Sequence, residues 1–251
     1  KILEEAGIEA VVGIQEAASR KMNEVFNKFI VTETPFVTLK AGITLDGKIA
    51  THSSDSKWIT SEEARHDVHQ LRNEHMAILV GVNTVIADNP ELTTRLPNGR
   101  NPIRIILDST LKIQLDRKVI TDKLVETWIF TSEIFDKEKK SLLESMGISV
   151  FPTTGSRQVN PTEVVQILGE KGISSLLIEG GGTINAAFLE HKLIDKAVIY
   201  IAPKLIGGQL APTFLEGSGI DKMGDAVELQ DADIIKIGKD FKFVGYPSYK
   251  N

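Results

Sequence analysis

The feature that most constrains the fold is a regular alternation of short apolar runs with amphipathic segments. The apolar runs cover residues 76–81, 103–107, 127–130, 148–151, 175–178 and 196–201. Helical segments are predicted at residues 137–146, 162–169 and 183–189. Strands that read as solid apolar runs and alternate with helices are typical of a parallel sheet covered on both faces. We therefore predict one α/β domain with a mixed, mainly parallel sheet flanked by helices.

Antiparallel elements are predicted at both ends of this domain. The segment PFVTLKAGITL (35–45) predicts a long strand, and Asp46-Gly47 predicts a hairpin turn after which KIAT (48–51) returns as its partner. Thr60 and Glu63 have capping-box spacing and predict the start of a helix that reaches about Arg72. Residues 232–238 and 241–246 predict a closing antiparallel hairpin.

Composition excludes several classes of protein. The chain has no Cys, which excludes disulfides, thiol nucleophiles and thiolate metal sites. Its 29 Lys and Arg against 34 Asp and Glu give a formal net charge of −5. The sequence has no basic stripe of the kind that binds nucleic acid. No apolar run approaches the roughly 20 residues that span a bilayer. We expect a cytoplasmic protein with no nucleic-acid or membrane partner.

The first thirty residues differ from the rest. They predict a helix end, a very short strand at 10–13 and a helix over 15–30. A lone four-residue strand needs a sheet, and no early partner follows it. This stretch is therefore either the tail of a preceding domain or an N-terminal extension that packs on the main domain.

The sharpest local motif is LLIEGGGTINAAFLE, in which an apolar strand leads through Glu179 and three glycines into a helix. Glycines allow close backbone approach to a phosphate, and a helix N-terminus faces it with free N–H groups. The motif is neither a Walker loop nor a GxGxxG fingerprint, and no acid follows about 20 residues later to hold a ribose 2′-hydroxyl. It predicts an anion site, unless the glycines serve only the packing of a tight turn.

Two ionisable residues are candidates for proton transfer. Glu179 lies at the carboxyl end of a strand, where burial would raise its pKa and suit it to that role, or it caps local N–H groups. Lys40 interrupts the apolar strand that precedes Asp46-Gly47. Alternation places its amine either outward or on the ligand side, where it could donate a proton.

Two loops and a histidine pair complete the candidates. THSSDSKWIT offers hydroxyls and the Trp58 indole, which could cover a ring. Arg72 and Arg95 could clasp a phosphate, or pair with nearby acids in solvent. His66 and His69 lie three apart on one helix, and without a third ligand we interpret them as a solvated helix face rather than a metal site.

Six segments, in order and spacing, resemble the reductase half of the bacterial bifunctional riboflavin biosynthesis deaminase/reductase. They are PFVTLKAGITLDGKIA, SKWITSEEARHDVHQLR, AILVGVNTVIADNPELTTR, PIRIILDS, LLIEGGGTINAAFLE and VIYIAPKLIGG. The resemblance implies that residues 1–33 are a linker and the tail of an N-terminal deaminase domain, and that 34–251 form the reductase domain. The deaminase zinc signature is missing, so the resemblance implies zinc only in that other domain and no metal site here.

The resemblance also implies a dihydrofolate reductase-like fold, NADPH as cofactor, and reduction of the ribosyl group of 5-amino-6-(5-phosphoribosylamino)uracil to the ribitylamino product. The implied NADPH contacts are Gly42, Trp58, Thr84, Asp88, Ser109, Gly181, Gly182, Thr183, Ile184, Asn185, Ala186 and Ala187. The implied substrate contacts are Ser56, Arg72, Leu92, Arg95 and Glu179.

We expect Lys40 and Glu179 to assist opening of the sugar and protonation of the developing oxygen. The alternatives are an oxidoreductase of the same fold acting on another pterin or pyrimidine, and a nucleotide-binding domain without chemistry. The resemblance, together with strands that could extend a sheet between subunits, favours at least a homodimer.

Overall fold

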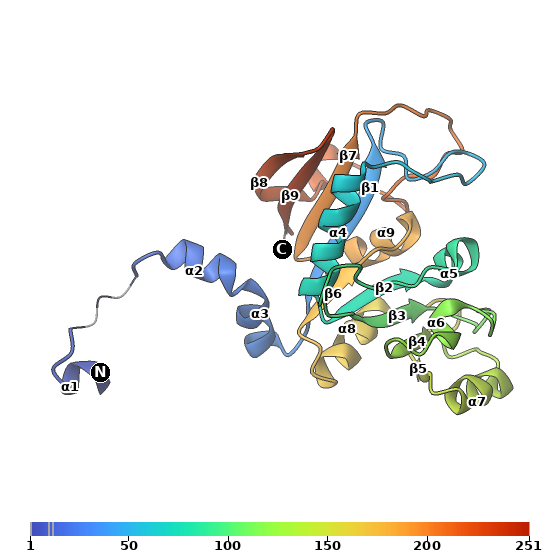
Figure 1. Cartoon of the computed structure of the whole chain (residues 1–251), viewed down its shortest axis with the longest axis horizontal. Helices are drawn as coiled ribbons and strands as arrows, with labels where there is room; N and C mark the ends of the chain where they lie inside the picture. Colours follow the sequence, from blue (N-terminus) through green and yellow to red (C-terminus); the bar gives the residue numbers. More distant parts are fainter. Residues whose placement is uncertain (1, 10, 12, 251) are drawn as a thin grey trace.

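The computed structural model describes residues 2–9, 11 and 13–250 and is built on one nine-stranded sheet (Figure 1). The strand order is β5-β4-β3-β2-β6-β1-β7-β9-β8. The strands are β1 (Phe36–Thr44), β2 (Ala77–Gly81), β3 (Ile103–Leu107), β4 (Thr127–Thr131), β5 (Ser149–Pro152), β6 (Ser175–Ile178), β7 (Lys196–Ala202), β8 (Glu228–Ile237) and β9 (Asp240–Ser248). Pairs among β1–β7 are parallel, whereas β9 pairs antiparallel with β7 and β8. The mixed, mainly parallel sheet and its closing hairpin are confirmed.

Helices cover both faces of the sheet, as the solid apolar strands predicted. The helices of the main body are α4 (Glu62–Glu74), α5 (Val82–Asp88), α6 (Lys118–Thr121), α7 (Lys137–Ser145), α8 (Pro161–Glu170) and α9 (Gly182–Glu190). Successive strand side chains point to opposite faces. Leu79 therefore packs with α8 and α9, whereas its neighbours Ile78 and Val80 pack with α5, α6 and α7. Helix α4 covers β6 and β7 through Val68 and Leu71.

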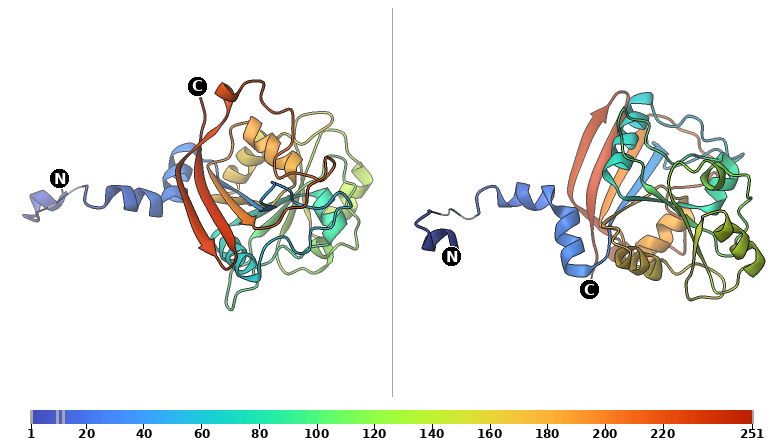
Figure 2. Two further views of the ribbon diagram at one scale, coloured as in Figure 1. Left: turned by 90° about the horizontal axis from the view of Figure 1, so that it is seen from above. Right: turned by 60° about the horizontal axis from the view of Figure 1, so that its bottom comes forward.

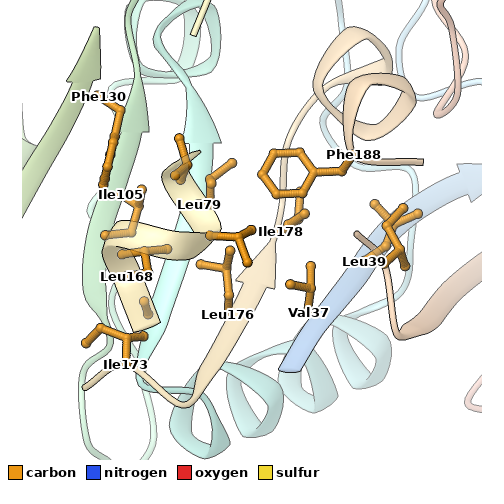
Figure 3. Packing of buried hydrophobic residues seen from close by; sticks show 14 of the residues in the cluster. Val37, Leu39, Leu79, Ile105, Phe130, Leu168, Ile173, Leu176, Ile178 and Phe188 are labelled. Atoms are coloured by element: carbon orange, nitrogen blue, oxygen red, sulfur yellow. The ribbon is translucent and has the colours of Figure 1, made fainter. Parts of the chain in front are cut away.

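Figure 3 shows the first of these faces, where Leu168 of α8 and Phe188 of α9 point toward the strands. Both side chains are fully buried, and Leu176 and Ile178 of β6 lie among them. Burying such side chains contributes about 1.5–3 kcal/mol each. The core thus fixes the central strand β6, and with it the glycine turn that follows.

The order of the central strands creates a crevice at their carboxyl ends. β6 lies between β1 and β2, although β1 and β2 are nearer in sequence. In open α/β sheets, ligands bind where the strand order reverses in this way. Leu39 of β1 is in register with Ile178 of β6, so Lys40 and Glu179 follow side by side at this crevice.

One local prediction next to β1 is wrong. The turn after β1 forms, with Gly47 donating to the Thr44 carbonyl, but KIAT does not return along β1. Instead Lys48 bridges Thr213 and Ile49 donates to the Pro212 carbonyl. The carboxyl-terminal part of β1 pairs instead with β7, whose register runs from Thr38 to Thr44 of β1.

The start of α4 is also displaced by one residue from the prediction. Its N-cap is Ser61, whose hydroxyl accepts from the Ala64 N–H at 3.3 Å, and not Thr60. The Ser61 N–H donates to the buried Asp240 carboxylate at 2.6 Å, which anchors this end of the helix to β9. The N-cap residue Ser61 thus also makes a contact with β9, and the spacing of residues near the helix start could not predict that contact.

We expect Ser61→Ala to lower the free energy of unfolding by about 1 kcal/mol, because the Ala64 N–H loses its acceptor. Urea unfolding measures the change. Ser141→Ala is the control, since it removes a hydroxyl from the middle of α7 that bonds only the Lys137 carbonyl. An unchanged midpoint for Ser61→Ala would show that the cap contributes nothing to stability.

The N-terminal helices α1 (Ile2–Glu5) and α2 (Glu16–Met22) extend away from the sheet, whereas α3 (Glu24–Thr32) lies against the main body (Figures 1 and 2). The single helix predicted over 15–30 is wrong, because the chain breaks at Asn23 between α2 and α3. The strand predicted at 10–13 lies partly outside the described residues, and the described Val11 and Gly13 are in no strand.

Helix α3 is fastened to the main body by polar contacts. Lys28 pairs with Asp195 at 2.5 Å, and Glu24 accepts from Lys196 at 2.7 Å and from Tyr246 at 2.8 Å.

Within the residues that the structure describes, no helix is long and apolar enough to cross a membrane.

Candidate active site

Two adjoining cavities lie at the carboxyl ends of β1, β2 and β6. The larger has a volume of about 540 Å³ and the smaller about 300 Å³. Thr84 of α5 and Gly181 before α9 line both of them. Cavities of this size are typical of small-molecule and cofactor sites. The crevice can therefore hold an extended ligand or two ligands side by side.

The larger cavity contains a buried cluster of three charged side chains. The Arg72 guanidinium donates to both oxygens of Glu179, from Nε at 2.7 Å and from Nη2 at 3.0 Å. Lys40 Nζ donates to Oε2 of Glu179 at 3.3 Å. The side chains of all three are mostly buried, with Glu179 10% exposed. Of the two orientations open to Lys40, the structure has the one on the ligand side.

The expectation that burial raises the pKa of Glu179 is wrong. Burial alone does raise it, but the positive charges of Arg72 and Lys40 and their hydrogen bonds outweigh burial. The net effect holds the pKa of Glu179 well below its usual range, so the carboxylate is ionised at neutral pH. In this arrangement Glu179 accepts hydrogen bonds from two cationic side chains.

Arg72 and Arg95, the two arginines predicted to clasp a phosphate, both line the larger cavity but have different partners. Arg72 is committed to Glu179, and its Nη1 donates to the Thr93 carbonyl at 3.1 Å. Arg95 is different, because its side chain is 66% exposed and its ion contact is with Glu91 at 4.0 Å. Arg95 is thus the arginine that can reach an incoming anion.

The glycine turn fits the phosphate of a nucleotide cofactor. Helix α9 has Gly181 as its N-cap and no side-chain cap, so its first N–H groups lack acceptors within the helix. A Cβ at Gly181 would meet nothing within 4 Å, which leaves this backbone open to the cavities. Its N–H groups and positive dipole end suit an anionic group.

Most predicted contact residues line one or both cavities. The larger is lined by Lys40, Gly42, Ser56, Trp58, Arg72, Thr84, Asp88, Leu92, Arg95, Glu179 and Gly181. The smaller is lined by Thr84, Ser109, Gly181, Thr183, Ile184 and Ala187.

Gly182, Asn185 and Ala186 line neither cavity and are buried in the fold. A Cβ at Gly182 would lie 2.5 Å from the Thr213 carbonyl oxygen, and Asn185 donates to the Phe214 carbonyl at 2.7 Å. These contacts hold the 213–216 segment against α9, which is a packing role.

Trp58 lies at the rim of the larger cavity and is 61% exposed. The Arg65 guanidinium lies over its ring at 4.5 Å from the centroid, and Arg65 also donates to the Thr60 carbonyl. This contact stabilises the indole at the cavity entrance. The hydroxyl-rich loop thus brings an aromatic ring to the site, as the sequence suggested.

His69 and Tyr200 are among the cavity residues that were not predicted from the sequence. His69 is half-buried, so the prediction of a solvated helix face holds for His66 but is wrong for His69. Its position three residues before Arg72 places both on one face of α4, a signal that was available. Among the described residues no group of His, Asp and Glu is arranged to hold a metal ion.

The fold and the joined cavities define an α/β protein with a small-molecule site at the switch point of its sheet. Residues 35–243 match the family model described as the RibD C-terminal domain. The chain belongs to this family.

Named relatives agree with this assignment. The riboflavin biosynthesis protein RibD of Bacillus amyloliquefaciens is 45% identical over 98% of this chain and 66% of the relative. The 2,5-diamino-6-ribosylamino-4(3H)-pyrimidinone 5′-phosphate reductase of Methanothermobacter thermautotrophicus is 38% identical over 82% of this chain and 95% of its own length. Acinetobacter baumannii RibD superposes with a TM-score of 0.82 at 30% identity, covering 98% of this chain and 67% of that one. The chain spans about two thirds of the RibD relatives.

Proposed function

We propose that the chain is an NADPH-dependent reductase of riboflavin biosynthesis that converts 5-amino-6-(5-phosphoribosylamino)uracil to 5-amino-6-(5-phosphoribitylamino)uracil. Family membership supports a reductase of this pathway. The observation that carries the proposal is the buried Lys40, Glu179 and Arg72 cluster beside an open glycine turn. It brings an ammonium group and an anion-binding backbone to one crevice, as reduction of a phosphorylated sugar by a nucleotide cofactor requires.

NADPH would lie across both cavities and supply the hydride for the reduction. The N–H groups at the start of α9 suit its pyrophosphate, and Thr84 and Gly181 line the passage between the cavities. Ser109 and Thr183 add hydroxyls to the smaller cavity. Gly42 and Trp58 line the larger cavity, where the reacting end of the cofactor would meet the substrate.

Lys40 is the proton donor in this mechanism. Opening of the sugar breaks the bond between C1′ and the ring oxygen, and the oxygen gains negative charge as the bond breaks. The Lys40 ammonium can give that oxygen a proton, while the exocyclic nitrogen supplies the electron pair that replaces the broken bond. Glu179 accepts a hydrogen bond from Lys40 at 3.3 Å and so positions its ammonium group, and Arg72 holds Glu179 in turn.

We expect Arg95→Ala to raise the KM for the phosphorylated substrate about tenfold with little change in kcat. The substitution removes a charge-assisted hydrogen bond to phosphate that stabilises the bound substrate and the transition state equally. Steady-state kinetics measure both constants. Arg100→Ala is the matched control, since Arg100 is exposed and does not line the larger cavity. An unchanged KM in Arg95→Ala would exclude the phosphate role.

The test of the activity is the decay of NADPH absorbance when the purified chain meets its substrate, with NADH in parallel. The proposal requires oxidation that depends on both components. The diamino compound in the name of the Methanothermobacter relative is the second candidate substrate, so both pyrimidines are assayed. Activity only with another pterin or pyrimidine would favour a different oxidoreductase, and binding without oxidation would favour a nucleotide-binding domain.

The domain division remains part of this proposal. Residues 1–33 are taken as a linker and the end of a zinc-dependent deaminase domain, and 34–251 as the reductase. The greater length of the RibD relatives supports it. The exposed edge strand β8 supports a homo-oligomer of at least two copies, which sedimentation would test.

A further inference from the structure

His69 is a cavity residue without a part in the mechanism above. It lies on α4 one turn before Arg72, and it lines the larger cavity together with Arg95. Its ring nitrogen Nδ1 is buried, and among the described residues none gives that nitrogen a hydrogen-bond partner. Buried polar atoms are normally partnered. Because Nδ1 is buried, a ligand in the cavity would meet the other edge of the ring, which lines the same cavity as Arg95.

The charges around His69 are arranged for an anion. The positive charges of Arg72 and Arg95 disfavour a proton on the His69 ring, and the negative charge of Glu179 favours one. His66, one turn away on the same helix, also disfavours that proton. Burial first, and then the two arginines, lower the pKa of His69 to about 4. The empty cavity therefore holds a neutral imidazole beside two guanidinium groups, of which only Arg72 is saturated by a carboxylate.

We propose that His69 is a further substrate-contacting residue, which hydrogen-bonds the phosphate group held by Arg95 and takes up a proton as that phosphate binds. The proposal rests on the proposed function for the identity of the substrate. The contact with His69 requires only a phosphate group, so any sugar phosphate whose phosphate reaches Arg95 would make it.

The direction of the coupling follows from electrostatics. A phosphate dianion beside Arg95 offsets the positive field that disfavours the imidazolium form, and it accepts a hydrogen bond from that form. The liganded pKa of His69 must then lie above the free value of about 4. Binding is therefore favoured below the liganded pKa and loses this contribution as the pH rises through it.

The test is an NMR titration of the purified chain labelled with ¹³C at histidine Cε1. The probes are ribose 5-phosphate and, as the control ligand, ribose. We expect the His69 resonance to titrate near pH 4 without ligand and at about pH 6 or above with saturating ribose 5-phosphate, and to ignore ribose. His69→Gln assigns the resonance, and His66→Gln is the matched control on the exposed face of α4.

Kinetics give a second readout. His69→Gln should raise the KM for the phosphorylated substrate about tenfold at pH 5.5 and less at pH 8.5, with kcat nearly unchanged, whereas His66→Gln should behave as wild type. A His69 titration that ribose 5-phosphate leaves unmoved, or a KM in His69→Gln equal to wild type at both pH values, would overturn the proposal. Failure of the proposed function would appear separately, as wild-type chain that oxidises no NADPH while the NMR titration still responds.

Discussion

Replacing Lys40 with Met is expected to lower kcat about 10²- to 10⁴-fold, the range typical of losing a positioned general acid. Met keeps the length and most of the volume of the side chain but has no proton to donate. The ring oxygen of the opening sugar then has no acid nearby, since Glu179 is held ionised by its neighbours. The binding constant for NADPH should change little, because the residues proposed to bind it do not include Lys40. Stopped-flow measurement of a single turnover reports the chemical step directly.

The control for this experiment is Lys137→Met on α7. Lys137 is an exposed lysine on a helix that lines neither cavity, so its loss should leave turnover as in wild type. A Lys40→Met variant with normal turnover and an unchanged pH profile would rule out Lys40 as the acid. Loss of NADPH binding in that variant would instead place Lys40 in cofactor binding.

Glu179→Gln is expected to lower the free energy of unfolding by about 3–5 kcal/mol, because it leaves the buried Arg72 without a counter-charge. The amide can accept one hydrogen bond from Arg72, but it cannot neutralise either cation. Glu144→Gln is the matched control, since its pairing with Lys140 is on an exposed helix face and should contribute less than about 1 kcal/mol. Urea unfolding at neutral pH measures both changes.

The same pair of variants gives a pH dependence whose sign is fixed. The pKa of Glu179 is lower in the folded chain than in the unfolded one, so its contribution to stability is present above about pH 4.5 and is lost as the pH falls. As the pH falls below about 5, the free energy of unfolding should decrease more in wild type than in Glu179→Gln, because only wild type loses the contribution of the ionised Glu179. Parallel acid unfolding curves for the two proteins would show that Glu179 is not held ionised by Arg72 and Lys40.

Much of the sheet could be predicted from the sequence, for a specific physical reason. Strands such as β2 and β6 are buried on both faces and read as unbroken apolar runs, so their identity does not depend on distant partners. Helix α5 was missed because Val82–Asp88 is short and follows β2 without a side-chain cap. Local patterns identify elements well where burial is uniform, and poorly where a helix is only seven residues long.

The candidate site was predictable as a set of residues but not as a charge network. The glycine turn and Lys40 stand out along the chain, yet their adjacency depends on the parallel pairing of β1 with β6. The partner of Glu179 lies on α4, 107 residues away in sequence. The direction of its pKa shift could not be predicted, because burial and the two cations act in opposite directions and only the fold shows which prevails.

Reduction of the ribosyl group can be tested by mass spectrometry of the product formed with NADPH carrying deuterium at the transferred C4 position. We expect 5-amino-6-(5-phosphoribosylamino)uracil to become a ribitylamino product with one deuterium, located at C1′ of the former sugar. A product without deuterium, or with deuterium on the pyrimidine ring, would contradict reduction of the ribosyl group and with it the roles given to Lys40 and Glu179.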